Sequence, residues 1–215
     1  MLFRSLLGPN IIRRTITDVS ITVDLGLGVA VNGLDAGTEA ASTWYYVWLI
    51  WNGTLLRGLL STSATAPTMP SGYTWKALIG VLRNDGSSNL VRSYQTDREV
   101  FVAMQTIFTA TAGSLTYVNL SGTPLTTFQG IVPPIAKIAR GTMGVSTNAN
   151  HAMAIAGDAN GVGSQCVAAA ASGTACDGFN IGSAFVVPLL SSQNFYWKAD
   201  STGAHYQITI SGYRI

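Results

Sequence analysis

The sequence predicts an all-β protein, an antiparallel β-sandwich of jelly-roll type with a short N-terminal arm. Three observations lead to this fold class. No window of about 11 residues keeps the apolar spacing of an amphipathic helix, and clusters of Gly, Pro, Ser and Thr interrupt most stretches. Short apolar runs are followed directly by turn dipeptides such as Asn52-Gly53. Near the C-terminus, Tyr206, Ile208 and Ile210 alternate with polar residues, as in a half-buried strand.

Strands are expected throughout the chain. The expected ranges are 19–25, 44–51, 54–60, 75–83, 90–95, 100–104, 115–120, 135–139, 152–156, 185–189, 195–198 and 205–211. The first alternates apolar and polar side chains, whereas Trp44 to Trp51 is a continuous apolar run suited to burial on both faces. Asn52-Gly53 and Asn84-Asp85-Gly86 predict hairpin turns. Pro133-Pro134 indicates an edge or a crossing, and the Gly-, Ala- and Ser-rich residues 157–182 predict a long surface loop.

The chain length favours a single sandwich domain, expected over residues 15–215. An N-terminal docking arm is expected over residues 1–14. The arm is apolar, but Arg4, Gly8 and Pro9 interrupt it, which argues against a secretory signal. The residues expected to dock are Leu2, Phe3, Leu6, Leu7, Ile11, Ile12, Arg13 and Arg14. No membrane insertion is expected, because the longest apolar run is far shorter than the roughly 20 residues that a spanning helix needs.

The composition favours contacts with other proteins. Only 10% of the residues are charged, against roughly 25% in typical soluble domains, and the mean hydropathy is +0.31. A chain so poor in charge often hides surface against partners. The net charge is only +2, and its basic residues are scattered apart from Arg13 and Arg14. Nucleic-acid binding is therefore not expected, because no basic stripe could follow a phosphate backbone.

The sequence holds few groups that could do chemistry. There are two histidines and ten carboxylates, and the motifs G-x-S-x-G, P-loop, H-E-x-x-H and C-x-x-C do not occur. We therefore expect no enzyme activity, no catalytic residue, no cofactor and no metal site. His205 is expected on the polar face of the last strand, and His151 could pair with Asp158.

The two cysteines leave two interpretations open. Cys166 and Cys176 flank a loop of small residues, and a disulfide between them would stabilise the fold by about 3 kcal/mol on a loop-entropy model. Two reduced thiols in a cytosolic protein explain the spacing equally well, because no export signal is evident.

Several charged and aromatic side chains allow two interpretations of their role. Asp35 is expected in a hairpin turn, and residues 97–99 are expected to form a solvated cluster. In the alternative, Arg98 and Glu99 pair across a subunit interface and help to orient the subunits. The five tryptophans are expected mostly in the core, although an exposed one could stack on a sugar ring.

An ordered set of turn and aromatic signatures resembles a recurring β module of tailed-bacteriophage virion proteins. The signatures are Asn32-Gly33-Leu34-Asp35-Ala36-Gly37, residues 42–48, residues 60–67, Pro70-Ser71-Gly72-Tyr73, residues 195–198 and residues 210–213. The likeness covers residues 16–102 and 185–215. It implies a structural role in the virion, usually as a trimer, and it brings no shared catalytic residues.

Two functions follow from this resemblance. The first is a capsid decoration or cement protein on the phage head, a homotrimer whose N-terminal arm docks on the major capsid protein or another virion protein. The second is a tail-fibre or tail-spike head domain that binds a host receptor or glycan, with residues 157–182 as the outward loop. Both place the protein on the surface of the phage particle after synthesis in the host cytoplasm.

Overall fold

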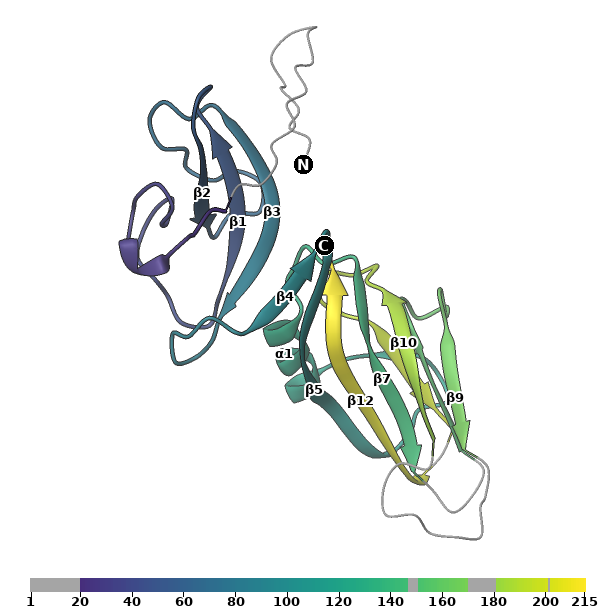
Figure 1. Cartoon of the computed structure of the whole chain (residues 1–215). Helices are drawn as coiled ribbons and strands as arrows, with labels where there is room; N and C mark the ends of the chain where they lie inside the picture. The colour runs from purple at the N-terminus through teal and green to yellow at the C-terminus, as the bar shows by residue number, and fades with distance from the viewer. Residues whose placement is uncertain (1–19, 147–150, 170–180, 201) are drawn as a thin grey trace, which may run out of the picture. The chain divides into compact units, whose positions relative to one another are not determined.

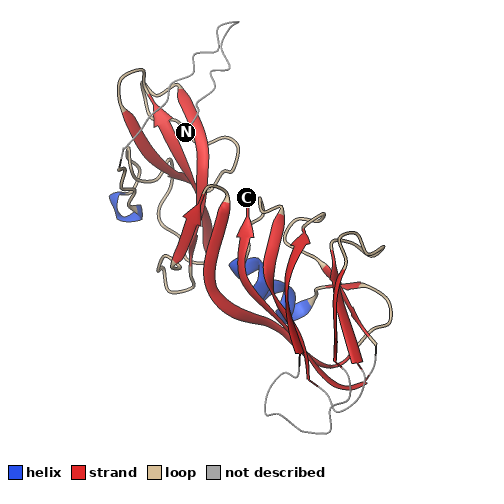
Figure 2. Ribbon diagram, turned by 45° about the vertical axis from the view of Figure 1, so that its right-hand side comes forward, coloured by secondary structure: helices blue, strands red, loops and turns tan. Residues whose placement is uncertain are grey.

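The computed structural model describes residues 20–146, 151–169, 181–200 and 202–215 (Figure 1). Strands dominate these residues, as Figure 2 shows, so the predicted all-β class is confirmed. The chain divides into two compact units, Met1–Val91 and Arg92–Ile215. The sequence predicts one sandwich domain over residues 15–215, and the boundary lies inside its expected strand 90–95. Leu90 only bridges to Asn84 in the first unit, whereas the next strand starts at Ser93 and joins a different sheet.

The first unit contains a three-stranded antiparallel sheet in the order β2-β1-β3. Its elements are a 3-10 turn η1 (Leu25–Leu27), β1 (Thr43–Trp51), β2 (Leu56–Ser61) and β3 (Trp75–Asn84). The predicted turn between β1 and β2 is confirmed. The Oδ1 atom of Asn52 accepts hydrogen bonds from the backbone N–H groups of Thr54 and Leu55 at 2.9 and 2.7 Å, and Gly53 adopts φ +101°.

The segment before β1 covers one face and one edge of this sheet. Leu25 and Leu34 pack on Tyr45 and Leu60 in a buried cluster. Asn32 exchanges hydrogen bonds with Gly58 on β2, through its backbone N–H and its Oδ1 atom, both at 2.9 Å. The expected strand 19–25 is therefore wrong in its described part: residues 20–24 form no ladder and lead into η1, whereas Val19 lies outside the described residues.

Asp35 fastens a second loop to the same sheet. Its Oδ2 atom accepts a hydrogen bond from the Ser61 hydroxyl at 2.7 Å and another from the Thr68 backbone N–H at 2.8 Å. Trp48 also donates from its indole Nε1 to the Ser63 carbonyl at 3.1 Å. Because Ser61 is buried on β2 and Thr68 lies in the loop between β2 and β3, Asp35 joins the sheet to this loop. The expected role of Asp35 in a simple hairpin turn is replaced by this cross-link.

The second unit is a sandwich of two antiparallel sheets. The five-stranded sheet has the order β10-β7-β12-β5-β4, and the four-stranded sheet has the order β6-β11-β8-β9. The strands are β4 (Ser93–Thr96), β5 (Glu99–Ala112), β6 (Val118–Asn119), β7 (Ile138–Ser146), β8 (His151–Ala156), β9 (Gln165–Ala169), β10 (Ile181–Pro188), β11 (Tyr196–Ala199) and β12 (Thr202–Arg214). The predicted antiparallel sandwich is confirmed, whereas the jelly-roll type is not confirmed by this strand order.

The core of this unit lies between the two sheets. Tyr206, Ile208 and Ile210 of β12 are buried, as their alternation predicts. The rings of Phe108 on β5 and Trp197 on β11 meet across the sandwich with centroids 4.4 Å apart. The burial of one face of each sheet leaves the opposite face of each strand for solvent or partners.

One helix, α1 (Gly122–Ile131), is not predicted by the sequence. It buries Phe128 and Ile131, and Phe128 packs edge-on against Phe195 at 5.2 Å between ring centroids. The Val132 backbone N–H still donates to the Phe128 carbonyl, and Pro133 then ends the helix. The expected loop over residues 157–182 is also wrong in part, because β9 and the start of β10 lie within it. Residues 170–180 lie outside the described structure.

Candidate functional site

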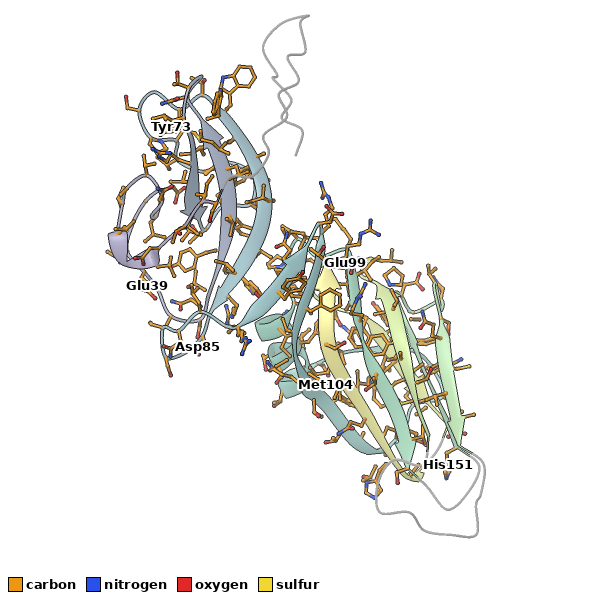
Figure 3. All side chains as sticks on the ribbon, viewed as in Figure 1. Glu39, Tyr73, Asp85, Glu99, Met104 and His151 are labelled. Carbon is orange, nitrogen blue, oxygen red and sulfur yellow. The ribbon has the colours of Figure 1, made fainter. Side chains whose placement is uncertain are left out.

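One end of the five-stranded sheet presents aromatic and charged side chains on its outer face. The strand register aligns Tyr94 of β4, Phe101 of β5, Gly212 of β12 and Arg140 of β7 in a row across the sheet. Tyr94 and Phe101 are 68% and 40% exposed, and their ring centroids lie 6.4 Å apart. We call Tyr94, Glu99, Phe101, Arg140 and Arg214 the arginine–aromatic strip, and Figure 3 labels Glu99 within it.

Glu99 holds the two arginines of the strip. Its Oε2 atom accepts a hydrogen bond from Arg140, and its Oε1 atom lies 3.5 Å from the Nε atom of Arg214. The guanidinium of Arg140 also lies 5.3 Å from the centroid of the Phe101 ring. These contacts fix Arg140 from two sides. Glu99 thus pairs with arginines within the chain. The alternative in which Arg98 and Glu99 pair across a subunit interface stays a prediction.

Gly212 creates the space in which Arg140 crosses the sheet. A Cβ atom at position 212 would lie 2.4 Å from the Val100 carbonyl oxygen and 3.3 Å from the Cδ atom of Arg140. Any side chain there would therefore collide with the backbone and displace the arginine. The glycine positions the strip without contributing a contact of its own.

The charge around the strip is positive. Arg98, Lys137, Arg140 and Arg214 lie at this end of the sheet, against the carboxylates of Asp97 and Glu99. Both carboxylate oxygens of Glu99 face arginines, whereas 53% of the Arg214 side chain is exposed. Donors of Arg214 thus remain available to an outside carboxylate.

At the far edge of the same sheet, a side chain forms hydrogen bonds with the backbone of the edge strand β10. Gln165 on β9 donates from its Nε2 atom to the Val186 carbonyl at 2.6 Å and accepts from the Val186 N–H at 3.1 Å. This amide makes the two hydrogen bonds that a neighbouring strand would make at that residue of β10. Pro188, which has no N–H, ends the strand. The closed edge at β10 contrasts with the exposed strip around β4 and β5.

A shallow pocket of about 230 Å³ lies on the outer face of the four-stranded sheet. Its lining is Leu115, Ala152, Met153, Ala154, Cys166, Lys198, Ala199 and Asp200. The Lys198 ammonium is already placed over the Tyr117 ring, 4.6 Å from its centroid. The carboxylate of Asp200 accepts from the Ala152 N–H at 2.9 Å and from the Tyr206 hydroxyl at 3.2 Å. The polar groups of this pocket are therefore largely occupied within the chain.

The histidines take the following places. His151 lies with its Nδ1 atom 3.2 Å from the Asp200 carboxylate, so the expected pairing with Asp158 is wrong (Figure 3 labels His151). Asp158 instead accepts the N–H groups of Asn160 and Val162 in its own turn. His205 is exposed on β12, as the alternation predicts.

The remaining predicted residues divide between the described and undescribed parts of the chain. The docking residues of the N-terminal arm and Cys176 lie outside the described residues. Cys166 is exposed on β9, and a disulfide with Cys176 stays a prediction. Trp48 and Trp197 are buried, and the other three tryptophans are partly buried. Sequence reasoning missed Phe101, Arg140 and Arg214, because only the strand register brings them together.

Burial and hydrogen bonding shift a few pKa values. Burial raises the pKa of Tyr213 and, in the first unit, that of Tyr46. The backbone N–H groups of Asn89 and Ser87 lower the pKa of Asp85, which holds the turn after β3 (labelled in Figure 3). Within the described ranges, no group of three or more His, Cys, Asp and Glu side chains is placed to hold a metal ion. No helix among the described residues is long and apolar enough to span a membrane.

Comparisons with known proteins add no relatives. No protein-family model matches the chain, and no curated protein or solved structure gives a significant match.

Proposed function

We propose that the chain is a non-enzymatic structural protein on the surface of a phage particle, a decoration or cement protein of the head. In this proposal it assembles as a homotrimer and docks on the major capsid protein or another virion protein. The virion and the trimer come from the sequence resemblance. The observation that carries the assembly part is the arginine–aromatic strip, where Tyr94 and Phe101 are exposed on a rigid sheet.

The physical support is that apolar side chains are exposed in a part of the second unit that has few charged residues. Between Glu99 and Lys137 the sequence contains no Asp, Glu, Lys or Arg. Met104, on β5 in the same stretch, is 64% exposed (Figure 3). Exposed aromatic and Met side chains beside arginine are the residue types enriched in the centres of protein interfaces. A surface of this composition favours association over catalysis.

A tail-fibre or tail-spike head domain that binds a host glycan is the second candidate. It is favoured by the exposure of the Tyr94 ring, because an exposed aromatic ring can stack on a sugar. Binding of the purified protein to extracted host-envelope glycans, lost on Tyr94→Ala, would support this candidate. Unchanged binding by that variant would contradict it.

The copy number of the chain in purified particles tests the main proposal. A decoration protein is present in many hundreds of copies, whereas a fibre or spike head is present in a few dozen or fewer. Quantitative mass spectrometry of the particle, calibrated against the major capsid protein, makes this measurement. Absence of the chain from the particle would overturn both candidates.

Deletion of residues 1–14 tests the predicted docking role of the arm. We expect the deleted protein to keep its oligomeric state but to lose incorporation into particles. The matched control replaces Arg4 and Arg13 with Lys, which keeps the length and charge of the arm. Normal incorporation of the deleted protein would refute the role of the arm as an anchor.

A further inference from the structure

We propose that the arginine–aromatic strip is the surface by which this unit docks on another virion protein, at a patch where carboxylates surround an apolar centre. This inference rests on the proposed function and names the interface and the chemistry of its partner. It concerns the described residues of the second unit alone, so it is independent of the N-terminal arm.

Among the described residues, Tyr94 and Phe101 are the only Phe, Tyr or Trp side chains that are exposed. Farther along the same outer face, the rows of the sheet carry small or uncharged side chains: Thr142, Gly144, Gly182, Ala184 and Gln207. Tyr94 and Phe101 thus form a local apolar centre, and they lie beside cations. Burial of such a centre removes apolar surface from water, which favours a partner that covers both rings.

The strip is also rigid before any partner binds. Arg140 is fixed by Glu99 and by the Phe101 ring, and Gly212 leaves the space for its side chain. A fixed arginine loses little side-chain entropy when a partner covers it. Four neighbouring strands, β4, β5, β12 and β7, supply the strip, so its geometry does not depend on a loop.

The excess of positive charge around the strip favours a partner whose surface is acidic. The four cations at this end of the sheet, Arg98, Lys137, Arg140 and Arg214, outnumber the two carboxylates of Asp97 and Glu99. The exposed part of Arg214 is available to form a bidentate pair with an outside carboxylate, which gives orientation as well as attraction. An acidic rim around an apolar side chain on the partner complements this arrangement.

The test measures binding of the purified full-length chain to particles from which it has been removed. We expect Tyr94→Ala to weaken binding by at least about tenfold, because central aromatic residues dominate interface energies. We expect Arg214→Glu to weaken binding at least as much, since it places a like charge opposite the acidic rim. Binding of the unmodified chain should weaken as salt rises, and Arg214→Glu should reduce this dependence.

Two matched controls separate the strip from general effects. Leu115→Ser removes an apolar side chain that is 77% exposed in the loop between β5 and β6 of the same unit. Lys76→Glu reverses an exposed cation in the first unit. Both variants should bind as the unmodified chain does, and circular dichroism should show that all four variants are folded.

Each outcome decides the inference. If the chain is present on the particle but the strip variants bind normally, the inference is overturned and the proposed function survives. If the chain is absent from the particle, both are overturned. If the strip variants lose binding to an acidic polysaccharide and not to the particle, the partner is a glycan, which overturns the protein partner proposed here.

Discussion

Asp35 offers a direct test of how the first unit holds its loops. Replacement by Ala removes the acceptor of two hydrogen bonds, from the Ser61 hydroxyl and the Thr68 N–H. A hydrogen bond to a charged group contributes about 1.5–3 kcal/mol, and the partial exposure of Asp35 lets water replace part of this. We therefore expect a loss of about 2 kcal/mol in the free energy of unfolding. For a unit of this size, that loss lowers the melting temperature by roughly 10 °C.

Tryptophan fluorescence can assign the effect to the first unit. Trp44, Trp48, Trp51 and Trp75 lie in that unit, and only Trp197 lies in the second. In Asp35→Ala, the melting temperature followed by tryptophan fluorescence should fall. The circular dichroism signal of the β-sheets should keep a component, from the second unit, whose melting temperature does not change. Asp35→Asn keeps one acceptor oxygen and should lose less. A melting temperature of Asp35→Ala within about 2 °C of the unmodified protein would refute the cross-link, since even 1 kcal/mol shifts it further.

Three further changes concern the second unit. Gly212→Ala should lower its stability by more than about 2 kcal/mol in urea unfolding, because the new Cβ collides with the Val100 carbonyl, and Ala184→Ser is the exposed control. Gln165→Leu should open the β10 edge and increase sedimenting aggregates, whereas Gln165→Asn, with a shorter reach, should give an intermediate amount; a fully soluble Gln165→Leu would contradict the capping role. Burial raises the pKa of Tyr213 above its ordinary 10.0, so its contribution to stability is complete below pH 10 and is lost as the unfolded chain ionises above it. Urea midpoints measured through this pH range should therefore fall less steeply in Tyr213→Phe than in the unmodified protein.

Local signals predicted the turns and several strands correctly. Asn52-Gly53 fixes its hairpin because the Asn side chain and the positive φ of Gly act within four residues. The alternation around Ile208 places the same residues in the core that the structure buries. These features depend on neighbours in sequence, so one chain is enough to identify them.

Features that depend on pairing at long range were missed. Glu99 on β5 meets Arg140 and Arg214 only because β5, β12 and β7 are neighbours in one sheet. The helix α1 buries only Phe128 and Ile131, too few apolar positions to show a helical period. The absence of charged residues between Glu99 and Lys137 was a signal in the sequence that could have singled out Glu99 as a partner for distant arginines.

The two quoted parts of the phage-module resemblance lie in different units. Residues 32–73 belong to the first unit, whereas residues 195–213 belong to the second. The resemblance treats them as parts of one module, and the strand pairing that would join them is not found among the described residues. Strand order, unlike turn chemistry, is set by pairing across the whole chain.

The chain passes from the first unit to the second once, between Val91 and Arg92, and each unit is continuous in sequence. A gene that encodes such a chain can exchange either half by a single recombination event at that junction, because no sheet of the described residues would lose a strand. The surface residues of one unit can thus change while the sequence of the other unit is inherited unchanged. In an evolving lineage, the two halves would then show separate histories of descent.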